Sequence, residues 1–193
     1  MESIEKIIKT LNVIEVRGAE NLDRLLGCIQ GLERLNAAID AQEASYGDIR
    51  MGIIANVRPD LYKSIVAEVP FVDVLTTMPN PYRPLTTGEY NEWGNPNDSI
   101  VYHYIKSYSP YDGVRQQDYP SMLVLASYYD SQVQYFEPAK WVAKLRASKT
   151  DNNLLLLKTD MESGHAGSSG RYKALKDEAF VYAFILHAVG IED

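Results

Sequence analysis

The chain has 193 residues, of which 46% are apolar and 23% are charged. This length and composition are typical of one ordinary soluble globular domain. The formal net charge of −7 argues against a nucleic-acid-binding protein, because phosphate binding needs a basic surface. No apolar run is long enough to cross a membrane, residues 1–11 lack the apolar core of a secretory signal, and the single Cys28 excludes an internal disulfide. We therefore expect a cytoplasmic protein that does not bind membranes.

Residues 1–44 form a segment of different character from the rest of the chain. Residues 12–16 are a candidate short strand, and Gly18 breaks it. Apolar residues at spacings of three and four then predict a long amphipathic helix over residues 20–43, namely Leu22, Leu25, Leu26, Ile29, Leu32, Leu35 and Ile39. We expect its apolar face to pack on a neighbouring element; binding a separate partner is the alternative.

From residue 51 onward the pattern alternates between helices and strands. Residues 51–57 predict a helix that ends before Pro59, and residues 64–69 predict a strand that Pro70 stops. Residues 76–120 hold many prolines and turn residues, which indicates a long loop with short helices at 89–93 and 100–107.

Two further strands are expected at residues 121–127 and 153–158, with a helix at 137–148 between them and a closing helix at 171–189. The expected inward residues are Trp141, Val142 and Leu145 on the first helix, and Leu175, Ala179, Tyr182, Ala183 and Leu186 on the second. Continuous apolar strands separated by helices indicate a parallel sheet covered on both faces. The fold class is therefore α/β, with functional groups expected in loops beyond the carboxyl ends of the strands.

An acidic residue and a histidine occupy two of these loops. Asp130 follows the second strand, and His165 follows the third between Gly164 and Gly167, which is the order acid, then histidine of α/β-hydrolases. Such a pair can serve acyl transfer, because a neutral imidazole takes a serine proton while a buried carboxylate fixes its tautomer. Taken alone, an Asp after a strand is more often a turn residue or a helix cap than a catalytic acid.

His103 and His187 lie on expected helices, where surface or packing roles are the simpler reading. No Cys or His group has the spacing of metal ligands, and no glycine-rich phosphate loop is present. We therefore expect neither a metal nor a cofactor.

Several long motifs resemble the oligopeptidase B enzymes of the prolyl oligopeptidase family. They are Met51-Gly52 with Asn56, residues 58–63 (RPDLYK), 69–78 (VPFVDVLTTM), 85–90 (LTTGEY), 92–96 (EWGNP), 107–112 (SYSPYD), 130–135 (DSQVQY), 137–146 (EPAKWVAKLR) and 158–161 (KTDM), and Gly164-His165. The resemblance covers residues 51–187 and implies the C-terminal part of an α/β-hydrolase serine peptidase. It also implies that Asp130 is the catalytic acid and His165 the catalytic histidine.

The nucleophile is the weakest part of the resemblance. Counting back from Met51-Gly52 places Ser45 at the family's serine, and the backbone N–H of Tyr46 would then contribute to the oxyanion hole. However, only Ser45 and Gly47 agree with the family's Gly-Gly-Ser-Ala-Gly-Gly turn, and residues 32–44 read as helix where a buried strand is required. Ser45 is thus either the retained nucleophile or the end of an unrelated N-terminal segment.

Substrate preference also follows from the resemblance. These enzymes cleave after Lys or Arg, and the resemblance assigns recognition of that basic residue to Glu89, with Glu92 following in the family pattern. Asn91 replaces a second family carboxylate, so a guanidinium would lose part of its paired acidic partner. Without the resemblance, Glu89 reads as a helix-terminus charge.

Two domains and three functions follow as hypotheses. Residues 1–44 would be a separate segment, and residues 45–193 the C-terminal part of the peptidase domain. The first function is a serine peptidase acting on short basic peptides. The alternatives are an inactive fragment without the family's earlier strands and β-propeller, in which an open sheet edge would allow self-association, and an interaction module.

Overall fold

The computed structural model describes residues 47–83, 85–167, 169 and 171–191. These residues belong to one compact unit, Asp48–Asp193, apart from Gly47, with which the first helix begins. The strand expected at residues 12–16, the helix expected at 20–43, and the candidates Ser45 and Tyr46 lie outside the described residues. The division at residues 44 and 45 therefore stays a prediction.

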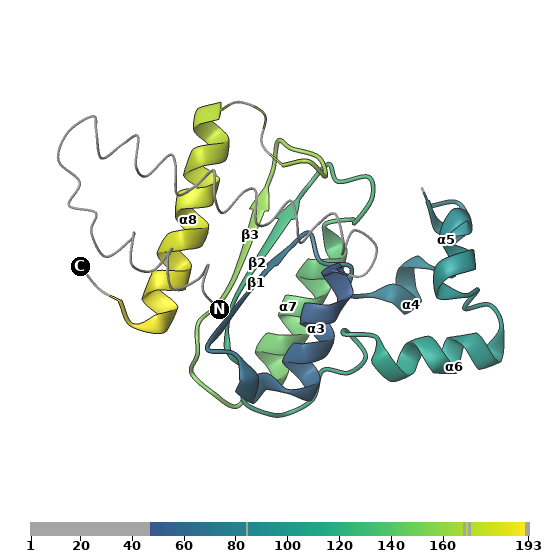
Figure 1. Cartoon of the computed structure of the whole chain (residues 1–193). Coiled ribbons are helices and arrows are strands. Elements are labelled where there is room, and N and C mark those ends of the chain that lie inside the picture. Colours follow the sequence, from purple (N-terminus) through teal and green to yellow (C-terminus); the bar gives the residue numbers. More distant parts are fainter. Residues whose placement is uncertain (1–46, 84, 168, 170, 192–193) are drawn as a thin grey trace, which may run out of the picture. The chain divides into compact units, whose positions relative to one another are not determined.

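A parallel sheet of three strands in the order β1-β2-β3 lies at the centre of this unit (Figure 1). The strands are β1 (Ser64–Glu68), β2 (Ser121–Ser127) and β3 (Leu155–Asp160). This arrangement confirms the expected α/β fold. β3 begins two residues later than expected because Asn153 belongs to the preceding loop, where its amide donates to the carbonyl of Tyr119 at 2.6 Å.

Helices cover both faces of the sheet, with α3 (Gly47–Val57) and α7 (Phe136–Ser148) on one face and α8 (Arg171–Val189) on the other (Figure 1). Trp141, Val142 and Leu145 of α7 are fully buried, as expected. Burying them removes apolar surface from water, which is the main favourable term in folding. The core that they share with the sheet consists of Ala55, Ile65, Ala67, Val72, Val114, Tyr119, Met122, Val124, Trp141, Val142 and Leu145.

The inward face expected for α8 is wrong in part, since Leu175 and Tyr182 are half-buried but the other three residues are not. Ala179, Ala183 and Leu186 are exposed, whereas Phe184 is buried with only 4% of its surface accessible. Apolar residues occur all around the second half of this helix, so their spacing does not distinguish one face. The contacts of α8 with β1 and β2 decide which stripe is covered.

Three short helices extend from the sheet between β1 and β2, one more than expected: α4 (Val74–Thr77), α5 (Thr86–Trp93) and α6 (Ser99–Tyr108). The carboxylate of Asp98 starts α6 by accepting the backbone N–H groups of Ile100 and Val101. Ile49 of α3, Val74 of α4 and Ile105 of α6 form a second apolar cluster with Met78. A 3₁₀ turn, η1 (Pro59–Leu61), precedes β1.

The position of α3 depends on close contact with the segment that follows α6. A Cβ atom on Gly52 would lie 2.6 Å from Cβ of Pro110, so only glycine fits without displacement. One turn later, the amide of Asn56 donates to the carbonyl of Pro110 at 2.8 Å. These contacts fix the helix whose amino end directly follows Ser45 and Tyr46 in sequence. None of the helices in the described part of the chain is long and apolar enough to cross a membrane.

Candidate active site

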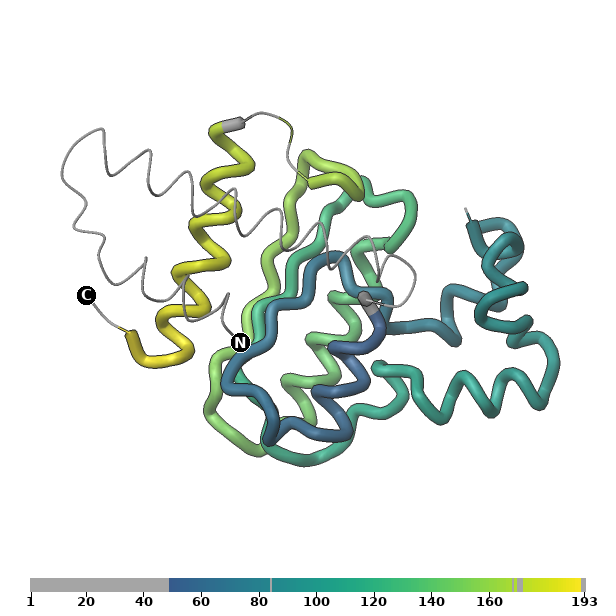
Figure 2. The backbone as a smooth tube through the Cα atoms, in the orientation of Figure 1, coloured from purple at the N-terminus to yellow at the C-terminus, as the bar shows by residue number. Residues whose placement is uncertain are grey.

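The loops after β2 and β3 leave the sheet side by side because of the strand register. Ser127 pairs with Asp160, so both strands end at the same level. The next two backbone N–H groups of the β2 loop donate across the gap, Tyr128 to the carbonyl of Asp160 at 2.8 Å and Tyr129 to that of Ser163 at 3.1 Å. Figure 2 shows both loops beyond this end of the sheet, where Asp130 and His165 follow.

Asp130 and His165 are hydrogen bonded, with 2.9 Å between Oδ2 of the aspartate and Nδ1 of the imidazole. The Asp130 side chain is fully buried. Its other oxygen, Oδ1, accepts the backbone N–H groups of Gln132 at 2.8 Å and Val133 at 2.9 Å. These two donors offset the loss of hydration and fix the orientation of the carboxylate.

This geometry assigns the imidazole tautomer. A carboxylate oxygen can only accept, so in the neutral imidazole Nδ1 carries the proton and Nε2 has the lone pair. The His165 side chain is 32% accessible, which leaves the ring open to a reacting group. The pair can therefore take a proton from a hydroxyl group at Nε2 while Asp130 stabilises the imidazolium that forms.

A tight turn holds His165 against the β2 loop. The N–H of Gly167 donates to the carbonyl of Gly164 at 3.0 Å, and Gly167 has a φ of +74°, which favours glycine. A Cβ atom on Gly164 would lie 3.4 Å from the carbonyl oxygen of Tyr129, so the two loops touch at this point. The sequence Gly164-His165-Ala166-Gly167 thus folds into the bend that brings His165 to Asp130.

A cavity of about 230 Å³ adjoins His165 between the sheet and α8. Its charged lining consists of four carboxylates and one lysine: Glu68, Asp160, Asp177, Glu178 and Lys158. Lys158 forms an ion pair with Asp177 at 2.5 Å. Asp160 is paired with Lys173 at 3.3 Å, so lysines compensate at least two of these four carboxylates. No three His, Cys, Asp or Glu side chains within the described residues are grouped as a metal site requires.

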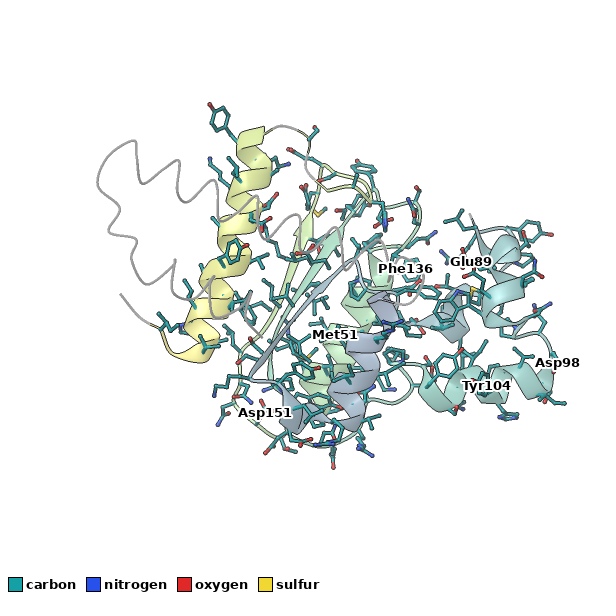
Figure 3. The ribbon with its side chains drawn as sticks, in the orientation of Figure 1. Met51, Glu89, Asp98, Tyr104, Phe136 and Asp151 are labelled. Atoms are coloured by element: carbon teal, nitrogen blue, oxygen red, sulfur yellow. The ribbon has the colours of Figure 1, made fainter. Side chains whose placement is uncertain are left out.

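The two carboxylates expected to bind the substrate, Glu89 and Glu92, lie on α5 and are not part of the Asp130–His165 pair (Figure 3 labels Glu89). Glu89 is half-buried, and the indole N–H of Trp93 donates to its Oε2 at 2.9 Å. Trp93 in turn packs edge-on against Phe71, with 5.7 Å between ring centroids. Glu92 is exposed. Glu89 is therefore the more firmly oriented of the two.

Sequence reasoning missed two residues of this region, Trp93 and Glu137. Trp93 lies four residues after Glu89 on a helix, a spacing that indicates contact between the two side chains. Glu137 is fully buried, and this burial raises its pKa from 4.5 to about 7. No sequence signal identifies it, because an acidic residue in the first turn of a helix is ordinarily a solvated one.

Comparison with known proteins gives a consistent family. A model described as the prolyl oligopeptidase family matches residues 42–192, a range that includes Ser45. "Protease 2" of Moraxella lacunata is 53% identical over 152 residues, which cover 79% of this chain and 22% of that protein. "Dipeptidyl aminopeptidase BI" of Pseudoxanthomonas mexicana is 47% identical over 153 residues, covering 79% of this chain and 21% of that protein.

The fold is also found in solved structures. Oligopeptidase B from Trypanosoma brucei, in a closed form with covalently bound antipain, superimposes with a TM-score of 0.74 at 51% identity. The match covers 77% of this chain and 21% of that structure. The chain thus spans about a fifth of the length of the relatives that it matches.

Proposed function

The chain belongs to the prolyl oligopeptidase family, and we propose that it carries the acyl-transfer site of an oligopeptidase B-like serine peptidase that cleaves peptides after Lys or Arg. The observation that carries this proposal is the buried Asp130 carboxylate hydrogen bonded to Nδ1 of His165. That arrangement leaves Nε2 as a base. Asp130 and His165 are the two members of a serine-peptidase triad that lie within the described residues.

In the proposed mechanism, Oγ of Ser45 attacks the scissile carbonyl carbon and gives its proton to Nε2 of His165. The backbone N–H of Tyr46 donates to the oxyanion, and His165 then returns the proton to the leaving amine. Two observations support Ser45 in this role. The family match begins before it, and α3 begins two residues after it, as a nucleophile at a strand-to-helix turn requires. The amino end of α3 would also favour the negative charge of the oxyanion.

The proposed preference for Lys or Arg rests on Glu89. Its carboxylate is oriented by Trp93, so a cationic side chain would meet a fixed partner. Glu92, exposed on the same helix, would add negative charge near the binding site. Short basic peptides are the proposed substrates. A cytoplasmic location belongs to the same proposal and is supported by the single Cys28.

Hydrolysis of fluorogenic peptides tests this function. The full chain is expected to cleave peptides that end in arginine or lysine before the reporter group, and to leave a citrulline peptide uncleaved, since citrulline has the shape of arginine without its charge. Ser45→Ala should abolish turnover, whereas Ser107→Ala, which changes an exposed serine on α6, should not. Turnover that survives Ser45→Ala would exclude the proposed nucleophile.

The alternative is a chain that keeps the fold without activity. One observation bears on it: β1 and β3 are the outer strands of the described sheet. An exposed strand edge can pair with another chain. A folded chain that cleaves none of these peptides and self-associates would support this alternative.

A further inference from the structure

A buried carboxyl group ties α7 to α4. Glu137 lies in the first turn of α7 with none of its surface accessible. Its Oε2 accepts the backbone N–H of Asp73 at 3.1 Å, and its Oε1 accepts the hydroxyl of Thr77. Asp73 is the residue that starts α4, and its own side chain does not cap that helix. Glu137 therefore supplies from another helix the contact that a helix usually provides locally.

A second contact joins the same two helices, and here α7 supplies the donor and the start of α4 supplies the acceptor. Lys140, one turn after Glu137, forms an ion pair with the carboxylate of Asp73, whose side chain is almost fully buried. Lys140 also donates to the hydroxyl of Thr76 at 3.3 Å. We call Asp73, Thr77, Glu137 and Lys140 the α4–α7 clasp. Because its central carboxyl group is buried, losing either hydrogen-bond partner would leave a polar group unsatisfied.

On the α7 side, the clasp is close in sequence to the catalytic acid. Glu137 follows Asp130 by seven residues, and Asp130 accepts the backbone N–H of Val133 within that interval. Arg83, in the segment between α4 and α5, lies over the ring of Phe136 at 4.7 Å, next to Glu137 (Figure 3 labels Phe136). Arg83 also donates to the side-chain oxygen of Gln134, which lies in the loop that carries Asp130, so this loop is joined to the segment between α4 and α5.

On the α4 side, the clasp leads to the candidate substrate carboxylate. The residue that follows α4, Met78, is buried in the second apolar cluster, against which Trp93 packs. Its carbonyl accepts the hydroxyl of Tyr90 from α5 at 3.0 Å. Trp93 then holds Glu89. A continuous set of contacts therefore joins the clasp to Glu89.

We propose that Glu137 is a positioning residue that fixes Glu89 relative to the Asp130–His165 pair through the α4–α7 clasp. It acts through α4 and α5 and touches neither the substrate nor the reacting atoms. The inference rests on the proposed function in that Glu89 is taken to bind the basic residue of the peptide. Loosening the clasp should then weaken recognition of that residue selectively.

The test compares two peptides on the full chain. Acetyl-Phe-Arg with a free carboxylate and the same peptide with citrulline are titrated by NMR, so that binding is measured without turnover. Glu137→Gln is expected to weaken binding of the arginine peptide about tenfold, the effect of losing one buried hydrogen bond, and to change binding of the citrulline peptide less than about twofold. Thr77→Val removes one donor to Glu137 and should act in the same direction if Glu137→Gln fails to fold. Asp60→Asn, at an exposed ion pair with Arg58, is the matched control.

Hydrogen exchange of backbone amides separates this inference from the proposed function. Glu137→Gln should raise exchange rates in α4 and α5 about tenfold while the amides around Trp141 stay protected. Unchanged exchange in α4 and α5, or equal weakening of both peptides, would overturn the positioning role. A wild-type chain that binds both peptides equally would refute the preference for Lys or Arg, and the exchange rates would still decide whether Glu137 holds α4 and α5.

Discussion

Replacing Glu137 with glutamine should change how the stability of the chain depends on pH. Burial raises the pKa of Glu137 from 4.5 to about 7, mainly by desolvating the charged form. Between these two pH values the folded chain keeps a proton that the unfolded chain has released. The free energy of unfolding of the wild type should therefore fall as pH rises from 4.5 to 7, and be steady with respect to this group outside that window.

The size of the effect follows from the pKa difference. A rise from 4.5 to about 7 corresponds to about 3 kcal/mol at roughly 1.4 kcal/mol per pH unit. Glutamine does not titrate, so the variant lacks this loss. Its amide also faces two donors, from Asp73 and Thr77, which adds a destabilisation that does not depend on pH.

The assay is urea unfolding of the full chain at several pH values, followed by tryptophan emission. Trp141 is fully buried on the same helix, so its emission reports unfolding of this part of the chain. The difference in unfolding free energy, wild type minus Glu137→Gln, should decrease by about 3 kcal/mol between pH 4 and pH 8. Asp60→Asn should not show this decrease. A difference that stays constant, or increases with pH, would refute the reasoning.

Three further changes test the site and the packing that positions it. Asp130→Asn should lower kcat for an arginine peptide roughly 10³–10⁴-fold in steady-state kinetics, since the amide favours the wrong tautomer; near-normal kcat would contradict this. Gly52→Ala should lower stability to urea by about 1–3 kcal/mol, because its Cβ meets the Pro110 ring, whereas Gly88→Ala, with open space around it, should not. Trp93→Phe removes the indole donor to the α5 carboxylate and should raise KM for arginine peptides with kcat unchanged; a change in kcat alone would argue against this role.

Much of the fold follows from local sequence pattern. β2 is a continuous apolar run between a proline and a turn, and Trp141, Val142 and Leu145 follow helical spacing, so both elements lie where the sequence predicts them. α4 has only four residues, three of them β-branched, and its contacts with Glu137 come from a distant helix. Local pattern could not reveal such a helix. The covered face of α8 was missed for a related reason, since only contact with the sheet selects Phe184.

The candidate site, too, was predictable from the sequence only in part. That Asp130 and His165 follow neighbouring strands was readable from the sequence, because parallel strands end at one edge of a sheet. Their 2.9 Å contact depends on strand register and on the bend at Gly167, which only the structure provides. Glu137 was invisible to sequence reasoning because its burial depends on α4. Ser45 and Tyr46 lie outside the described residues, and their roles stay predictions.

The central claim is that Ser45 is a nucleophile activated by His165 and Asp130. The most direct test is to label the full chain with a fluorophosphonate probe. The modified peptide is then mapped by mass spectrometry. We expect one modified residue, Ser45, with labelling abolished by Ser45→Ala and strongly slowed by His165→Ala. A folded chain that is not labelled, or one labelled equally well after Ser45→Ala, would contradict the claim.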